Sequence, residues 1–294
     1  MGDGGREAGD EGRMTNDDRL TTADKDIDIC VDSLSFTYPS GIEALHQVSL
    51  HIAAGESLAL IGQNGAGKTT LVKHFNGLLK PTTGSVLISG QDTRQRSVAQ
   101  LARQVGYVFQ NPDDQLFKPT VLGEVMFGPQ NLGWEASRVA DMAQAALQMV
   151  NLSQVASRHP YDLSPGERKR VALAAVLAMD TPVIILDEPT TGQDYAGVHL
   201  VGQIVDSLIA LEKTVITITH DIDFCAEHFE RVVAMAGGRK LIEGPSRVVL
   251  SQAEILVETY VEPPQLIRLA SELGMEWTPL TVDEFIEHLP ENRE

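Results

Sequence analysis

Residues 62–70 read Gly-Gln-Asn-Gly-Ala-Gly-Lys-Thr-Thr and match the P-loop pattern G-x-x-x-x-G-K-[ST]. This loop binds phosphate only between a buried strand and a helix, whose N-terminus adds partial positive charge to the inward-facing N–H groups. Both neighbours are expected, because residues 57–61 form a short apolar run and a helical segment follows. The sequence therefore predicts a triphosphate site in which Lys68 reaches the β- and γ-phosphates and Thr69 binds Mg²⁺. The candidate nucleotide-binding residues are Gly62, Gln63, Asn64, Gly65, Ala66, Gly67, Lys68, Thr69 and Thr70.

The rest of the chain supplies the elements of an α/β fold around this loop. The runs 183–186 and 214–219 are, like 57–61, short and nearly continuously apolar or β-branched, which is typical of parallel strands buried on both faces. The alternating runs 27–31 and 48–52 predict antiparallel strands. Helices are expected at 70–78, 134–150 and 167–179, and a closing hairpin at 231–242.

Composition limits the classes of function. The formal net charge of −18 argues against a general nucleic-acid binder, since neutralising phosphates requires clustered Lys and Arg. Cys30 and Cys225 have no partner at ligand spacing, so neither a disulfide scaffold nor a zinc site is expected. No run approaches the roughly eighteen apolar residues that span a bilayer, so any membrane role is peripheral. Residues 1–26 are rich in Gly, Asp and Glu and predict a disordered acidic tail.

Acidic and polar side chains follow the expected parallel strands. Because the carboxyl ends of such strands lie beside the P-loop, Asp187 is expected to hold Mg²⁺ and Glu188 to act as the catalytic base on water. An Asp-Glu pair alone is usually solvated surface, but the buried strand before it favours the functional interpretation. His220 follows the next strand and is expected to orient the water at the γ-phosphate, although a structural His is equally common.

A second anion site is indicated by residues 163–167, Leu-Ser-Pro-Gly-Glu, which begin an expected helix whose free N–H groups attract negative charge. In chain order the P-loop, Gln110, this segment, Asp187-Glu188, Asp194 and His220 resemble an ABC-type ATPase over about residues 27–244. The resemblance implies that Gln110 contacts Mg²⁺ and the attacking water. It also implies that Tyr38 stacks on adenine, with a buried strand tyrosine as the alternative.

The same resemblance identifies the anion that residues 163–167 would bind. In ABC-type ATPases two domains pair head to tail, so Ser164, Gly166 and Glu167 would act in trans on the γ-phosphate bound by a partner, and Asp194 would lie in the dimer-interface loop. The sequence departs from the family's Leu-Ser-Gly-Gly-Gln. Pro165 removes an N–H donor but suits a helix start, and Glu167 is expected either to reach the ribose hydroxyls or to pair with a neighbouring Arg.

A narrower resemblance lies in residues 110–117, 190–195 and 263–269, which are similar to the ATPase subunit of energy-coupling-factor (ECF) transporters, the vitamin and cobalt or nickel importers. This resemblance implies ATP and Mg²⁺ as cofactors and a second ATPase subunit, identical or paralogous. It further implies an integral membrane scaffold subunit and a substrate-binding membrane subunit as partners, no nucleic acid, and a peripheral location at the cytoplasmic face of the cell membrane.

Two regions would serve assembly if the ECF resemblance holds. Leu116, Phe117 and Val121 would line a groove for a coupling helix of the membrane subunit, with packing on their own domain as the alternative. Residues 245–294 would form a small helical C-terminal appendage that holds two ATPase subunits together. Its last helix is expected to be capped by Thr281, with Glu284 three residues on.

The expected fold is thus α/β: a P-loop NTPase core with a parallel sheet, an antiparallel β subdomain, a helical signature subdomain at about 111–180 and the C-terminal appendage. The leading function is an ATP-hydrolysing subunit of an ECF-type importer. One alternative is a soluble ABC-type clamp on nucleic acid or ribosomes, but such proteins usually carry two cassettes or coiled-coil insertions. Another is an ATP-binding, weakly hydrolysing partner subunit, prompted by Pro165 and Glu167 although Glu188 and His220 are intact.

Overall fold

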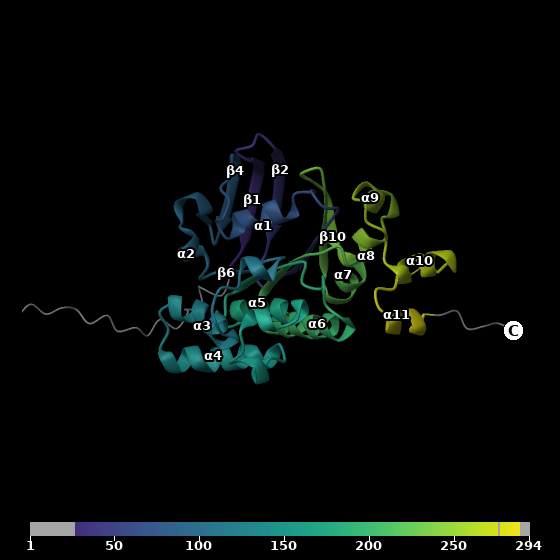
Figure 1. The fold of residues 1–294 in the computed structure, drawn as a ribbon. Coiled ribbons are helices and arrows are strands. Elements are labelled where there is room, and N and C mark those ends of the chain that lie inside the picture. Colours follow the sequence, from purple (N-terminus) through teal and green to yellow (C-terminus); the bar gives the residue numbers. More distant parts are fainter. Residues whose placement is uncertain (1–26, 276, 289–294) are drawn as a thin grey trace, which may run out of the picture.

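The computed structural model describes residues 27–275 and 277–288, so the expected acidic tail 1–26 lies outside the described residues. Two sheets pack over one another, and helices cover the larger sheet (Figure 1). The larger sheet has six strands in the order β10-β9-β3-β8-β7-β6. Its strands are β3 (Ser57–Ile61), β6 (Val105–Val108), β7 (Val183–Asp187), β8 (Thr214–Ile218), β9 (Arg231–Ala236) and β10 (Arg239–Pro245).

The centre of the six-stranded sheet is buried on both faces. All residues of β3, β7 and β8 are buried, and their side chains alternate between two apolar cores. In β3, Leu58 and Leu60 belong to one core, and Ala59 and Ile61 to the other. The continuous apolar runs therefore reflect parallel strands covered from both sides, as expected. Only β10 runs antiparallel, as the second strand of the predicted hairpin.

The register of the parallel strands aligns their carboxyl ends. Ile218 of β8 lies opposite both Leu60 of β3 and Asp187 of β7, and Leu186 lies opposite Val108 of β6. The segments that leave these strands consequently emerge side by side along one sheet edge, where ligands bind in open α/β sheets.

The smaller sheet is antiparallel, in the order β2-β1-β4-β5. Its strands are β1 (Ile29–Thr37), β2 (Glu43–Ile52), β4 (Thr83–Ile88) and β5 (Gln91–Asp92). Its inward side chains share a core with one face of the six-stranded sheet and with the helix after the P-loop. The antiparallel β subdomain therefore covers the P-loop side of the molecule.

Helices form the remaining layers. They are α1 (Lys68–Phe75), α2 (Val98–Leu101), α3 (Val121–Asn131), α4 (Ala136–Met149), α5 (Pro165–Leu177), α6 (Tyr195–Ala210), α7 (Ile222–His228), α8 (Ser246–Leu250), α9 (Ala253–Glu258), α10 (Gln265–Glu272) and α11 (Val282–Glu287). Helices α3, α4 and α5 pack on one another. The helices predicted at 70–78, 134–150 and 167–179 correspond to α1, α4 and α5, with ends shifted by a few residues.

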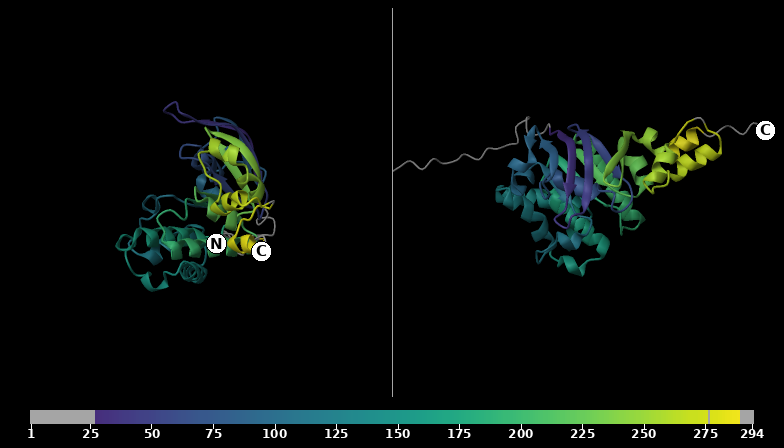
Figure 2. Two further views of the ribbon diagram at one scale, coloured as in Figure 1. Left: turned by 90° about the vertical axis from the view of Figure 1, so that its right-hand side faces the viewer. Right: turned by 90° about the horizontal axis from the view of Figure 1, so that it is seen from above.

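The C-terminal helices α9, α10 and α11 lie on the opposite side of the molecule from α3 and α4 (Figures 1 and 2). Arg247 of α8 contacts the last part of this region. Its guanidinium lies 2.8 Å from the Glu284 carboxylate of α11 and 4.3 Å from the Trp277 ring centre. Thr281 accepts a hydrogen bond from the Glu284 N–H at 3.3 Å, so it caps α11 as predicted. The region also contacts the P-loop, since the Gln63 N–H donates to the Thr259 carbonyl at 2.9 Å.

Candidate active site

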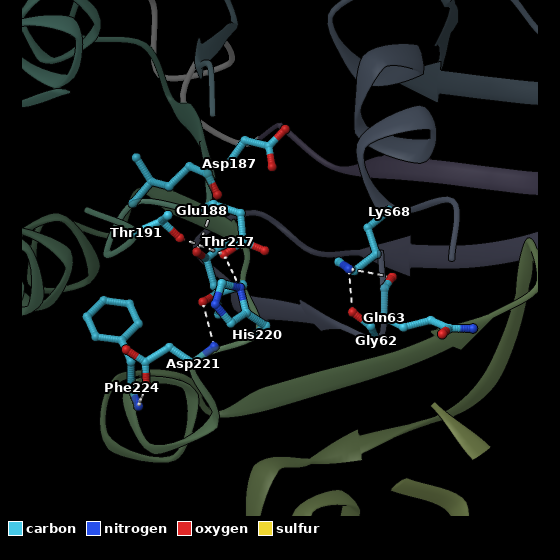
Figure 3. A network of polar contacts seen from close by, with 12 residues as sticks. Gly62, Gln63, Lys68, Asp187, Glu188, Thr191, Thr217, His220, Asp221 and Phe224 are labelled. Atoms are coloured by element: carbon cyan, nitrogen blue, oxygen red, sulfur yellow. Dashed lines mark hydrogen bonds and ion pairs between the residues drawn. The ribbon is translucent and has the colours of Figure 1, made fainter. Parts of the chain in front are cut away.

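The loop between β3 and α1 takes backbone conformations that require glycine. Gly62 and Gly67 have φ of +139° and +99°, and a Cβ would lie 2.1 Å from the Met235 carbonyl oxygen at Gly62 and 2.8 Å from that of Ala44 at Gly67. The Lys68 ammonium donates to the carbonyls of Gly62 and Gln63 (Figure 3). Burial lowers the pKa of Lys68, while the Glu188 and Asp187 charges act to raise it.

Asp187 ends β7 beside this loop with one fully engaged carboxylate oxygen. Oδ2 accepts from the Tyr107 hydroxyl at 2.6 Å and from the Thr69 hydroxyl at 3.1 Å. Oδ1 is buried without a hydrogen-bond partner among the described residues. Burial raises the pKa of Asp187, and the hydrogen bonds from Tyr107 and Thr69 oppose that rise. A free buried carboxylate oxygen next to a threonine hydroxyl fits Mg²⁺, which binds hard oxygen ligands and so offsets the cost of burying the charge.

Glu188 follows directly in a left-handed backbone conformation, with φ of +51°. Its side chain is 4% exposed, and Oε2 lies 2.8 Å from Nδ1 of His220 (Figure 3). His220 itself is 65% exposed. A buried carboxylate with one imidazole contact is a suitable proton acceptor for a water molecule at the mouth of the site.

A cavity of about 460 Å³ joins the predicted residues of the P-loop side. The predicted residues in its wall are Tyr38, Asn64, Gly65, Ala66, Gly67, Lys68, Thr69, Thr70, Gln110, Asp187 and Glu188. Tyr38 is half-buried, and its hydroxyl lies 3.0 Å from the Thr70 hydroxyl. A larger cavity of about 690 Å³ lies between His220 and the C-terminal residues 260–265, but it lacks the P-loop, so the smaller cavity is the candidate nucleotide site.

The segment predicted to bind a second anion, residues 163–167, lies outside the nucleotide cavity. Ser164, Gly166 and Glu167 do not line the nucleotide cavity. Ser164 caps α5, and its N–H and hydroxyl both donate to the Glu167 carboxylate, at 2.9 and 2.8 Å. Asp194 likewise lies outside the cavity, where its carboxylate caps α6 by accepting from the Gly197 N–H at 2.8 Å.

The predicted pairing of Glu167 with a neighbouring Arg is replaced by this capping box. Arg168 lies 3.3 Å from the Asp113 carboxylate, and Arg170 donates to the Val150 carbonyl at 3.3 Å. The physical reason is local. A Glu at the third helical position lies close to the N-cap backbone of its own helix, and it reaches that backbone more easily than it reaches a side chain farther along the helix.

A family model described as "ABC transporter" matches residues 45–191, half of the chain, including the P-loop, residues 163–167 and Asp187-Glu188. The chain belongs to the ABC transporter family. The predicted resemblance to the ATP-binding subunits of ECF transporters is confirmed by relatives with that name. It is 43% identical to "Energy-coupling factor transporter ATP-binding protein EcfA1" from Methanospirillum hungatei JF-1, over 82% of this chain and 87% of that protein.

Other comparisons agree on the family and differ in length. The chain is 44% identical to a "Putative ABC transporter ATP-binding protein" from Methanosarcina acetivorans over 83% of this chain, yet it spans only 40% of that relative. A solved structure of cbiO1 from Clostridium perfringens, part of the ABC transporter complex cbiONQ, is 33% identical, has a TM-score of 0.70 and covers 84% of this chain and 98% of its own. The predicted fold class is thereby confirmed.

Two residues that contact the candidate site were not predicted from the sequence. Tyr107 lies in β6 and donates to Asp187, and Lys169 lies in α5 and donates to the backbone around Glu188. Neither residue gave a sign in the sequence. Lys169 stands between Arg168 and Arg170 in a charged run that is typical of a solvated helix face, and an aromatic residue such as Tyr107 is ordinary in a strand.

The prediction that Leu116, Phe117 and Val121 line a docking groove is partly wrong. Leu116 and Val121 are 4% and 0% exposed and belong to the core, so they pack on their own domain. Phe117 is 61% exposed and meets the Phe127 ring edge to face at 4.8 Å between ring centres. The buried Glu124 carboxylate accepts the N–H groups of Phe117 and Lys118. The loop therefore presents one apolar side chain from a fixed backbone.

Proposed function

We propose that the chain is the ATP-hydrolysing, energising subunit of an ECF-type ABC importer for a vitamin or transition-metal ion. It would act in a head-to-tail dimer with an identical or paralogous ATPase subunit. One observation carries the proposal: the P-loop, Asp187 and Glu188 line one cavity, whereas the helix start at Ser164 stands outside it. The ECF names of relatives from Methanospirillum hungatei and Methanocaldococcus jannaschii support the transporter class.

Within one chain, the residues of the cavity would bind and orient ATP. The P-loop N–H groups and Lys68 hold the phosphates, and Tyr38 packs against the adenine. Thr69, Asp187 and Gln110 would hold Mg²⁺, which neutralises phosphate charge when bound. Glu188 accepts the proton of the attacking water, and His220 beside it orients that water.

The missing wall of the site would come from the second subunit. Ser164 and the Gly166 N–H lie at the N-terminus of α5, where the partial positive charge of the helix favours an anion. Placed against the partner's γ-phosphate, they would close the partner's cavity and exclude water. ATP binding thus closes the dimer, and hydrolysis reopens it. Asp194 would lie at this interface, and the C-terminal appendage would hold the pair together.

The membrane partners would be an integral scaffold subunit and a substrate-binding membrane subunit, with the ATPase at the cytoplasmic face. The described residues contain no helix long and apolar enough to cross a bilayer. Exposed Phe117, fixed beside Phe127 and Lys118, offers an apolar contact for the scaffold. No residue of this chain is assigned to the transported substrate.

Two measurements test this function. Specific ATPase activity is measured across protein concentrations and should fall on dilution, because a lone chain lacks half of its site. An undiminished specific rate for monomers on a sizing column contradicts the shared site. Purification from native membranes should recover an integral membrane protein in proportion to the ATPase. Consistent recovery of ribosomes or DNA instead contradicts the transporter and supports the soluble clamp.

A further inference from the structure

Lys169 is a buried lysine that the proposed chemistry does not use. It lies in α5, within two helical turns of the cap at Ser164, and is 5% exposed. Its ammonium donates to the Glu188 carbonyl and, at 3.0 Å, to the Thr191 carbonyl. Burial lowers the pKa of Lys169, and the Glu188 and Asp187 charges oppose that effect. Burying an ammonium is costly, so the contact points to a role beyond packing.

The segment that Lys169 holds has a backbone conformation that needs support. Glu188 has φ of +51°, which is uncommon for a residue with a side chain and carries backbone strain. On one side its N–H donates to the Ile218 carbonyl of β8 at 2.8 Å. On the other side its carbonyl accepts from Lys169. The two contacts fix the peptide groups on both sides of the Glu188 Cα and therefore set the direction in which its side chain leaves the backbone, while contacts to His220 and Thr191 hold the carboxylate.

A second contact joins the same two elements farther along. The Gln193 side-chain amide donates to the Gly166 carbonyl at 3.2 Å, next to the α5 start. The segment from Glu188 to Gln193 is thus tied to α5 at both ends. The start of α5 is the part proposed to face the partner's nucleotide, whereas Glu188 lines this chain's own cavity.

We propose that Lys169 is a positioning residue for the catalytic base of its own chain, holding the Glu188 backbone so that the carboxylate faces the attacking water. This inference rests on the proposed function. Lys169 does not line the nucleotide cavity; it acts through the carbonyls of Glu188 and Thr191. The alternative is that Lys169 only braces α5, which would make it matter for the partner's site rather than for its own.

The first test is Lys169→Met, which keeps the apolar stem and removes the ammonium. Because replacing a buried charge by an apolar side chain of similar volume is often tolerated, the variant should fold. ATP affinity and KM should stay within about twofold, and kcat should fall by about 10²-fold, the effect of misplacing a reacting group by about 1 Å. In a Glu188→Gln background the same change should lower the residual rate no further. An unchanged kcat, or an equal loss in the Glu188→Gln background, overturns the inference.

The second test separates the two roles of α5 by mixing full-length chains. One chain carries Lys68→Ala and the other Ser164→Ala, so that each homodimer is inactive and only the mixed dimer has one complete site. That site uses the P-loop and Glu188 of the Ser164→Ala chain. If the unmodified mixture has no activity, the shared-site function fails, and the role of Lys169 is then decided by the first test alone.

Lys169→Met is then placed on either chain of the active mixture. On the Ser164→Ala chain, which supplies Glu188, it should reduce kcat by the same factor as in the first test. On the Lys68→Ala chain, which supplies only the start of α5, the rate should stay within about twofold, since a distant site shares no contact with it. A loss of kcat when Lys169→Met is on the Lys68→Ala chain, or an equal loss of kcat with the change on either chain, shows that Lys169 stabilises α5 and overturns the positioning role.

Discussion

The Nδ1 atom of His220 lies 2.8 Å from the Oε2 atom of Glu188, although the two residues follow different strands. Glu188 comes after β7 and His220 after β8, and these neighbouring parallel strands end in register. The same oxygen accepts from the Thr191 hydroxyl at 3.4 Å. Carboxylate and imidazole are therefore brought together by sheet geometry rather than by sequence proximity.

Glu188→Gln should abolish turnover while ATP binding persists. The amide keeps the size of the side chain but is a poor proton acceptor, so kcat should fall by about 10²- to 10⁴-fold. With ATP and Mg²⁺ the variant should accumulate as a closed dimer, measured by size-exclusion chromatography with nucleotide quantified in the peak. Unchanged hydrolysis would remove Glu188 from the role of base.

Glu167→Gln should strengthen the closed dimer. Glutamine preserves the capping box, so the melting temperature should change little. Losing one negative charge beside the partner's triphosphate should raise ATP-dependent dimerisation roughly fivefold. The dimer dissociation constant in the Glu188→Gln background is the readout, and weaker dimerisation contradicts the placement of Glu167.

Lowering the pH from 8 to 6 should not strengthen the dimer in the way that Glu167→Gln does. Hydrogen bonds from the Ser164 N–H and then the Ser164 hydroxyl hold the pKa of Glu167 below its usual value. Because the pKa of Glu167 is lower in the folded state than in the unfolded state, the cap's contribution to stability is fully present above the unfolded-state pKa. That contribution is lost as the pH falls through the folded-state pKa. Dimerisation measured from pH 8 to 6 should therefore show no step from Glu167; a step abolished by Glu167→Gln contradicts this.

Tyr107→Phe should weaken the binding of Mg²⁺ without affecting nucleotide binding itself. The change removes the 2.6 Å hydrogen bond that orients Asp187, and a bond to a charged group contributes about 1.5 to 3 kcal/mol. The half-saturating Mg²⁺ concentration for hydrolysis should rise about tenfold or more, while ATP affinity in EDTA stays unchanged.

Tyr38→Phe is the matched control for this prediction. It removes the hydroxyl of a residue that lines the nucleotide cavity, and this hydroxyl contacts Thr70 instead of Asp187. The Mg²⁺ requirement should be that of the unmodified protein. Equal shifts in both variants would show that the effect is not specific to the Asp187 contact.

Phe117→Ala and Leu116→Ala should separate docking from stability. Phe117 is 61% exposed, so its removal should leave the melting temperature and basal ATPase activity unchanged while reducing recovery of the membrane partner. Leu116 is 4% exposed, and its truncation should cost about 2 to 5 kcal/mol of unfolding free energy. Undiminished membrane recovery with Phe117→Ala would count against the docking surface.

The sequence alone predicted the central parallel strands and most of the nucleotide cavity because both depend on local patterns, whereas helices α3 and α6 were not predicted. A P-loop needs glycines and a lysine at fixed spacing, and a strand buried on both faces needs an unbroken apolar run. These requirements located Gly62 to Thr70, Asp187 and Glu188 without any knowledge of long-range contacts. The helix start within residues 163–167 was equally local.

Only the tertiary structure decided which side chains are free to act. Leu116, Phe117 and Val121 are all apolar in the sequence, yet packing against the helical core buries two of them and leaves one exposed. Tyr107 and Lys169 gained their contacts with Asp187 and Glu188 because β6 pairs with β7 and α5 packs nearby. Spacing along the chain encodes a loop or a cap, whereas a contact across dozens of residues depends on how whole elements pack, and no local pattern records that packing.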